Sequence, residues 1–270
     1  MEFTSPAPGH DQGSEPRDGL RLFVFPHAGG SSLTYQDWPD RFPVGWQVRA
    51  LDAPGHGPLL DAAPLTDGNA LIGHFFDRLV PELSANGTPF AFFGHSMGAL
   101  VAYELTRRLL AEGAPAPVWL GVSACGAPRG HTDEPTPPHP GELSDAELRR
   151  TLAALGGTPA QVLRTEELWQ VFAPAIRADL TLLRTWRPAP PAAPLPVALS
   201  AFAGTRDAAA LPARVASWAE HTEHFLGLHV FDGGHFYFQD GPDAAARLAG
   251  RVTADVRGAL RSGRAAAGLR

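Results

Sequence analysis

Apolar residues fall into six short runs along the chain, and most of these runs end at Gly, Pro or Asp. Several runs are apolar throughout instead of alternating, which is typical of strands that other elements cover on both faces. We therefore expect each run to form a strand. The predicted strands are Leu22–Phe25, Gln47–Leu51, Phe90–Phe93, Val118–Val122, Val197–Phe202 and Leu228–Phe231.

Helical patterns lie between many of the predicted strands. Residues Ala70–Leu83 carry apolar side chains at helical spacing, Met97–Glu112 follows the third strand directly, and Asp243–Leu260 closes the chain. Alternation of strands and helices predicts an α/β fold in which helices flank both faces of a mainly parallel sheet.

The alternation is interrupted between about Gly126 and Pro194. This interval opens with a loop rich in Pro and His, Arg129–Pro140. We interpret residues 126–194 as a helical lid inserted between two strands. The alternative is a set of additional scaffold helices with no gating role.

Two helices are predicted inside this interval. Ser144-Asp145-Ala146-Glu147 fits a capping box, which predicts that a helix begins there. A second helical pattern runs from Glu166 to about Trp186 and contains Pro174, which we expect to kink the helix or to split it. The aromatic residues of this segment could line an acyl chamber or simply pack within the lid; they are Trp169, Phe172 and Trp186.

The length of 270 residues suits a single large domain with an insertion. We predict a disordered leader over residues 1–19, where the chain is polar and rich in Pro and Gly. The core is expected to comprise residues 20–125 and 195–262, separated by the lid at 126–194. A flexible tail is expected at 263–270.

Composition excludes several classes of protein. The formal net charge of −6 argues against nucleic-acid binding, which depends on clustered cations. The single cysteine, Cys125, excludes an intrachain disulfide and a cysteine-rich metal site. The chain has neither an apolar run of about 18 residues nor the apolar core of a signal peptide. We therefore expect a cytoplasmic protein that does not enter the membrane.

Gly94-His95-Ser96-Met97-Gly98 matches the pattern Gly-x-Ser-x-Gly. The pattern gains weight from its context, because a predicted strand precedes it and a good helix-forming segment, Ala99–Leu105, follows. This strand–turn–helix arrangement is the nucleophile elbow of α/β-hydrolases. The serine must adopt a strained conformation there, and glycine two residues away on either side removes the Cβ atoms that would clash.

A serine hydroxyl needs a base, and the base needs an acid that orients it. His235 lies in a Gly-Gly-His loop just after the last predicted strand, so we expect it to reach Ser96. Asp207 follows the preceding strand and fits the chain order nucleophile, acid, histidine. Asp232 is the chief rival, but its place at the end of a strand suggests that it caps the turn. Asp179 is expected to lie in the lid helix, too far from the edge of the sheet.

An oxyanion hole requires two backbone N–H donors. We assign them to Met97, which follows the nucleophile, and to Ala28, in a Pro-His-Ala-Gly-Gly loop after the first predicted strand. His27 and Gly29 of the same loop, together with Phe236, are expected to bind substrate. Metal and cofactors are not expected to take part. Cys125 is interpreted as a spectator thiol, because no elbow surrounds it.

These motifs resemble the type II thioesterases of polyketide and nonribosomal peptide pathways, over about Leu22 to Gln239. The resemblance implies a stand-alone editing enzyme that hydrolyses acyl groups from the phosphopantetheine arm of acyl or peptidyl carrier proteins, acting as a monomer, with Asp207 as the acid. It rests on Phe25–Gly30, Ala53–Gly55, Gly94–Gly98, Arg177–Leu180 and Gly233–Phe236.

One position departs from the family. The resemblance implies Pro-Gly-Arg-Gly after the second strand, whereas this chain has His56 in place of the arginine. A histidine that is neutral at pH 7 would remove a fixed positive charge there. Three other functions use the same scaffold: acyl transfer to an alcohol or amine, hydrolysis of small-molecule esters, and a catalytically silent binding module.

Overall fold

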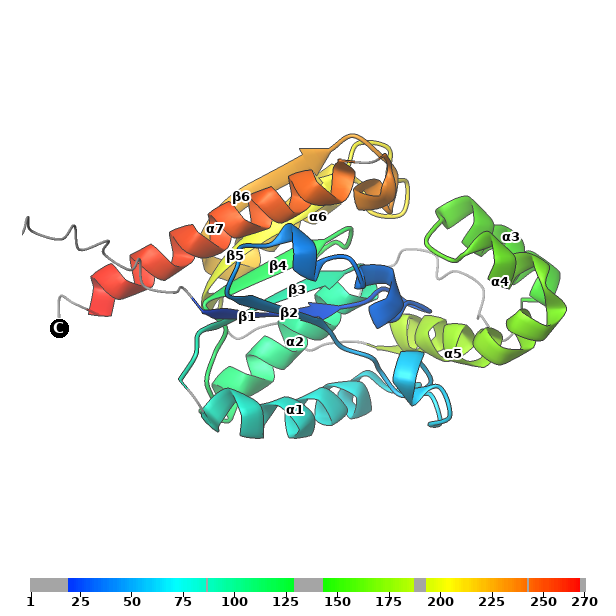
Figure 1. Cartoon of the computed structure of the whole chain (residues 1–270), viewed down its shortest axis with the longest axis horizontal. Helices are drawn as coiled ribbons and strands as arrows, with labels where there is room; N and C mark the ends of the chain where they lie inside the picture. Colours follow the sequence, from blue (N-terminus) through cyan, green and yellow to red (C-terminus); the bar gives the residue numbers. More distant parts are fainter. Residues whose placement is uncertain (1–18, 86, 129–142, 187–192, 242, 268–270) are drawn as a thin grey trace, which may run out of the picture.

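Six parallel strands form the central sheet of the described chain (Figure 1). This computed structural model describes residues 19–85, 87–128, 143–186, 193–241 and 243–267. The strand order is β2-β1-β3-β4-β5-β6, and each neighbouring pair is parallel. The strands are β1 (Leu20–Phe25), β2 (Trp46–Ala50), β3 (Phe90–His95), β4 (Trp119–Ser123), β5 (Leu195–Gly204) and β6 (Thr222–Phe231). All six predicted strands and their parallel arrangement are confirmed.

Helices cover both faces of the sheet, as predicted. Helices α1 (Gly68–Ala85) and α2 (Met97–Ala111) pack on one face, and α7 (Ala244–Ala267) packs on the other (Figure 1). Every residue of β1, β3 and β4 is buried, which explains why these strands are almost continuously apolar in sequence. A short helix, α6 (Pro212–Val215), follows β5.

The described helices between β4 and β5 lie beyond the carboxyl ends of the strands (Figure 1). They are α3 (Asp145–Leu155), α4 (Ala160–Arg164) and α5 (Glu166–Thr185). The predicted capping box at Ser144 is present at the start of α3. Pro174 does not split α5, which continues as one helix. The short α4 was not anticipated by the sequence pattern.

The inserted helices form a small apolar core of their own. Trp169 is fully buried in it, and Phe172 packs against it. Trp186 instead packs on Gly68 at the start of α1. These three side chains therefore have packing roles in this structure. A gating role for residues 126–194 stays a prediction, and the loop 129–140 lies outside the described residues.

The described residues include little of the predicted leader but most of the predicted tail. Of the predicted leader, only residue 19 is described. Helix α7 runs past Leu260 to Ala267, into the segment predicted as a tail. In the described part of the chain, no helix combines the length and the apolar character that crossing a membrane requires.

Candidate active site

Ser96 occupies the turn between β3 and α2. Its backbone has φ 55° and ψ −117°, a strained combination for a residue with a side chain. A Cβ at Gly94 would lie 2.0 Å from the Gly98 carbonyl oxygen, and a Cβ at Gly98 would lie 2.0 Å from the Phe25 carbonyl oxygen. The two glycines are therefore required sterically. The Ser96 side chain does not cap α2, which leaves the hydroxyl available to another partner.

That partner is His235, from the loop after β6. Its Nε2 atom lies 3.0 Å from the Ser96 Oγ atom, and its Nδ1 atom lies 2.8 Å from an Asp207 carboxylate oxygen. His235 is 7% exposed and Asp207 is 1% exposed. Three residues separated by up to 139 positions thus form one continuous chain of hydrogen bonds. This is the arrangement that activates a serine nucleophile.

Backbone groups hold the Asp207 carboxylate in place. Its second oxygen accepts hydrogen bonds from the N–H groups of Ala209 at 2.9 Å and Ala210 at 3.0 Å. Burial acts to raise the pKa of Asp207, but the hydrogen bond and charge of His235 and these two N–H groups outweigh it, so the pKa is lowered. The carboxylate therefore stays ionised behind the imidazole.

The rival acid, Asp232, points elsewhere. Its side chain is 77% exposed and forms an ion pair with Arg206. It also accepts a hydrogen bond from the Thr205 hydroxyl at 3.1 Å. The structure thus brings Asp207, and not Asp232, against His235.

The two N–H groups assigned to the oxyanion hole come from different elements, and each is free of a backbone acceptor within the described residues. Met97 is the first residue of α2, so its N–H has no acceptor inside the helix. Ala28 lies in the loop after β1, and its N–H makes no turn or loop hydrogen bond within the described residues. The next N–H, that of Gly29, donates to the Asp179 carboxylate at 2.7 Å.

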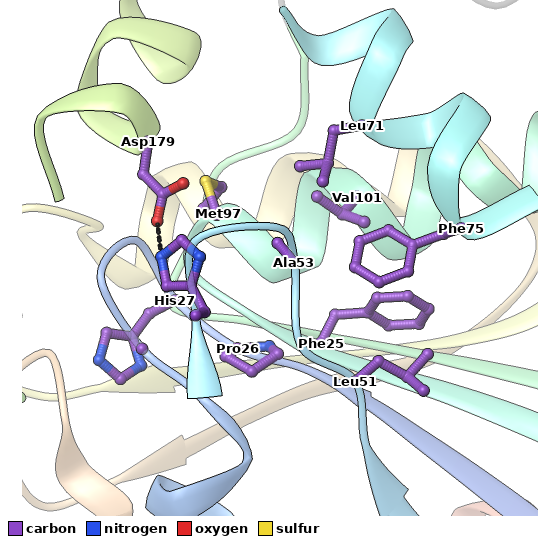
Figure 2. Close-up of a pocket in the computed structure, with 12 residues that line it drawn as sticks. Phe25, Pro26, His27, Leu51, Ala53, Leu71, Phe75, Met97, Val101 and Asp179 are labelled. Carbon is purple, nitrogen blue, oxygen red and sulfur yellow. Dashed lines mark ion pairs between the residues drawn. The ribbon is translucent and has the colours of Figure 1, made fainter. Parts of the chain in front are cut away.

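A cavity lies beside the elbow. It holds about 280 Å³ of empty space, part of it open to solvent. Met97, His27 and Asp179 line it, whereas Gly29 and Phe236 are not among its lining residues. Five apolar side chains gather on the side away from Asp179 (Figure 2): Phe25, Leu51, Leu71, Phe75 and Val101.

Comparisons with known proteins agree with this geometry. A family model for the thioesterase domain matches residues 20–254. The chain belongs to the thioesterase family. The thioesterase is 34% identical over 223 residues to the linear gramicidin dehydrogenase LgrE of Brevibacillus parabrevis, a match that covers 80% of this chain and 81% of LgrE.

Two solved structures of thioesterases are similar to this thioesterase over nearly their whole length. RedJ, a thioesterase from the prodiginine biosynthetic pathway in Streptomyces coelicolor, has a TM-score of 0.77 and 30% identity, covering 94% of this chain and 91% of RedJ. BorB, a type II thioesterase from the borrelidin biosynthetic cluster, has a TM-score of 0.76 and 33% identity, covering 93% of this chain and 95% of BorB. The α/β-hydrolase fold expected from the sequence is therefore confirmed.

Three other ionisable side chains near the nucleophile of the thioesterase are unsuited to serve as its base or as a second nucleophile. Burial, followed by the charges of His235 and His56, lowers the pKa of His27 to about 3. Burial holds the pKa of His95 well below its usual range, and its Nδ1 atom lies 2.8 Å from the Ser123 hydroxyl. Burial also raises the pKa of the Cys125 thiol to about 12, so this thiol is protonated at neutral pH.

One expectation about a charged residue was wrong, and a second charge is favoured where its loss was expected. Asp179 was expected to lie far from the edge of the sheet, yet α5 brings its carboxylate to the loop after β1. The Asp179 carboxylate also forms an ion pair with His56, at 2.9 Å from Nε2 (dashed line in Figure 2). Burial acts to lower the pKa of His56, but the hydrogen bond and charge of Asp179 outweigh it and raise the pKa overall. The positive charge thought to be lost with the family arginine is thus favoured here.

The role of Asp179 was missed because no local pattern reports it. Asp179 and Gly29 are 150 positions apart in sequence. The one local signal is the segment Arg177–Leu180, which resembles the family.

Proposed function

We propose that this thioesterase hydrolyses acyl groups from the phosphopantetheine arm of acyl or peptidyl carrier proteins, as an editing enzyme of a polyketide or nonribosomal peptide pathway. The observation that carries the proposal is the Ser96–His235–Asp207 chain of hydrogen bonds, next to an apolar cavity that Met97 lines. The names of RedJ and BorB place those proteins in such pathways. The dehydrogenation in the name of LgrE is not carried over, because an activated serine performs acyl transfer.

The reaction proceeds in two halves. In the first, the Ser96 oxygen bonds to the thioester carbonyl carbon while His235 takes the hydroxyl proton. The N–H groups of Met97 and Ala28 stabilise the oxyanion. The carbon–sulfur bond then breaks, and His235 gives its proton to the departing pantetheine thiol. In the second half, His235 takes a proton from water, hydroxide attacks the acyl-serine, and the freed Ser96 oxygen recovers the proton.

The cavity is the proposed site for the acyl chain. Its apolar side would bury methylene groups at about 0.8 kcal/mol each. Only about 20 Å³ of the cavity can hold the centre of a water-sized sphere, which is close to the room that one water molecule needs. We therefore expect short acyl groups to be hydrolysed faster than long ones while α5 is docked as in this structure.

Mass spectrometry of carrier proteins loaded with single acyl groups tests the proposal. Ser96→Ala is expected to reduce acyl release by about 10⁶-fold, close to complete loss. Ser262→Ala, at an exposed position of α7, is the matched control and is expected to leave the rate unchanged. Unimpaired hydrolysis by the Ser96→Ala variant would overturn the mechanism.

The same assay separates the alternative functions. Release of free acid without an added acceptor favours hydrolysis, whereas release only with an alcohol or amine favours acyl transfer. Faster cleavage of the matching oxygen ester than of the carrier-bound thioester favours a small-molecule esterase. Failure of a fluorophosphonate to label Ser96 favours a silent scaffold.

We also propose that the thioesterase acts as a monomer in the cytoplasm. A monomer of 28.6 kDa is the expected result of light scattering coupled to size-exclusion chromatography. A mass twice as large would contradict it. Fractionation of the producing cells tests the location.

A further inference from the structure

Two carboxylates hold the backbone of the loop after β1. Asp52, in the loop after β2, accepts a hydrogen bond from the Ser32 N–H at 2.7 Å. Asp179, in α5, accepts one from the Gly29 N–H at 2.7 Å. The first anchor follows a strand of the sheet, whereas the second belongs to the inserted helices. The end of the loop that carries Ala28 is held by a turn hydrogen bond from the Gly30 N–H to the His27 carbonyl oxygen, 2.9 Å, and by the Asp179 carboxylate of α5.

Helix α5 lies directly on the two loops that follow β1 and β2. A Cβ at Gly29 would lie 2.8 Å from the Ile176 Cγ1 atom. A Cβ at Gly55 would lie 3.4 Å from the Ala175 Cβ atom. This close approach brings the Asp179 carboxylate within hydrogen-bonding distance of a backbone N–H, with no room for an intervening water.

Both ring nitrogens of His56 face acceptors. Nε2 lies 2.9 Å from the Asp179 carboxylate, and Nδ1 lies 3.2 Å from the Pro54 carbonyl oxygen. The contact between Nε2 and the Asp179 carboxylate is an ion pair, and it is attractive only while the ring is an imidazolium. Asp179 is 3% exposed and His56 is 5% exposed, and a buried carboxylate without a cation is costly.

Burial is the largest single influence on the pKa of His56, and it opposes the imidazolium. Asp179 from α5, the Pro54 carbonyl group and Asp52 from the loop after β2 favour the imidazolium, and together they outweigh burial. His27, from the loop after β1, does not compete for the proton, because its pKa is lowered to about 3.

We propose that Asp179 and His56 are positioning residues for the hydrolytic reaction. Asp179 holds the Gly29 N–H and thereby aims the adjacent Ala28 N–H at the oxyanion, while protonated His56 keeps the Asp179 carboxylate, and with it α5, in place. The proposal rests on the proposed function, in which Ala28 is an oxyanion donor. It makes docking of α5 a condition for a complete oxyanion hole.

A structural salt bridge and a positioning pair differ in their effect on kinetics. If the pair positions the donor, its loss lowers kcat, because the oxyanion forms only in the transition state. Loss of a whole oxyanion donor lowers kcat by about 10²- to 10³-fold. A donor that is present but poorly oriented should lower kcat by a smaller factor. For Asp179→Ala we therefore expect kcat to fall by about 10- to 100-fold, with KM changed by less than about threefold.

The pH profile gives an independent readout. In the wild type, kcat should fall on the alkaline side as His56 loses its proton, because Asp179 is then a buried carboxylate without its cation. His56→Arg keeps the charge at all accessible pH values. This variant should keep the activity at neutral pH and should lose the alkaline decline. His56→Gln should have low kcat at every pH.

The experiment compares these three variants with Asp145→Ala. Asp145 also forms an ion pair with α5, through Arg177 at 2.6 Å, but it does not contact the loop after β1. Hydrolysis of an acyl pantetheine thioester is measured from pH 5 to 10, with circular dichroism to show that each variant is folded. A kcat of Asp179→Ala within twofold of the Asp145→Ala value would overturn the proposal. So would an alkaline decline retained in His56→Arg.

A failure of the proposed function can be distinguished from a failure of this proposal. The rate at which a fluorophosphonate labels Ser96 depends on the oxyanion hole without requiring the natural substrate. If the wild type is labelled but does not cleave the thioester, the proposed substrate class is wrong, and labelling rates then rank the variants. Equal labelling of the wild type and Asp179→Ala contradicts the positioning role. If the wild type is not labelled at all, Ser96 is not an activated nucleophile and both proposals are wrong.

Discussion

Replacing Asp207 by Asn changes one atom of the proposed acid and should invert the hydrogen bonding of the base. One Asp207 oxygen accepts the N–H groups of Ala209 and Ala210, at 2.9 and 3.0 Å. The amide oxygen of an Asn would take this place, because only an acceptor fits there. The amide NH₂ would then face His235 Nδ1, which forces the remaining proton onto Nε2. A protonated Nε2 cannot take the proton of Ser96.

The expected cost follows from this geometry. A histidine held in the wrong tautomer lowers kcat by about 10⁴-fold in a serine protease triad. At about 1.36 kcal/mol for each factor of ten, this is about 5.4 kcal/mol of lost transition-state stabilisation. The fold should survive, because the hydrogen bond to His235 is only reversed in direction and loses its charged acceptor, at a cost of about 1 to 3 kcal/mol.

The assay is steady-state hydrolysis of an acyl pantetheine thioester, with urea denaturation as the measure of stability. Asp232→Asn is the matched control, since Asp232 is exposed and pairs with Arg206 instead of His235. We expect this control to retain activity within twofold of the wild type. A loss of less than tenfold in kcat for Asp207→Asn, or an equal loss in both variants, would refute the role of Asp207 as the acid.

Two further predictions concern the cavity and the acid stability of the fold. Val101→Phe should fill the cavity, and so lower kcat/KM for a hexanoyl thioester by about tenfold or more while sparing an acetyl thioester. Val101→Ala should favour the longer chain. Equal effects on the two matched thioesters would show that the acyl group binds elsewhere. The pKa of His27 is about 3 in the folded state and about 6.5 in the unfolded state. Between these two pH values the unfolded state binds one more proton than the folded state. The free energy of unfolding therefore falls as the pH decreases. His27→Gln should therefore reduce this slope between pH 6 and 4 by about 1 kcal/mol per pH unit in urea denaturation, and an unchanged slope would contradict the buried neutral state.

The sequence alone determined the features whose causes are local. Uninterrupted apolar runs predicted β1, β3 and β4, because a strand covered on both faces has no polar side. The spacing of Gly94, Ser96 and Gly98 predicted the elbow, because a strained turn excludes Cβ atoms at those two positions. The capping box at Ser144 predicted the start of α3 for the same kind of reason, since both partners lie within one turn.

The tertiary structure decided what depends on groups far apart in the chain. The raised pKa of His56 could not be inferred from its neighbours in sequence, because Asp179 lies more than 120 positions away and reaches it only when α5 docks. Pro174 does not split α5, which continues through it and packs against Gly29 through Ile176. A local pattern reports only interactions between residues that are close in sequence. Electrostatic pairs and helix docking depend on distances in space, and folding alone sets these distances.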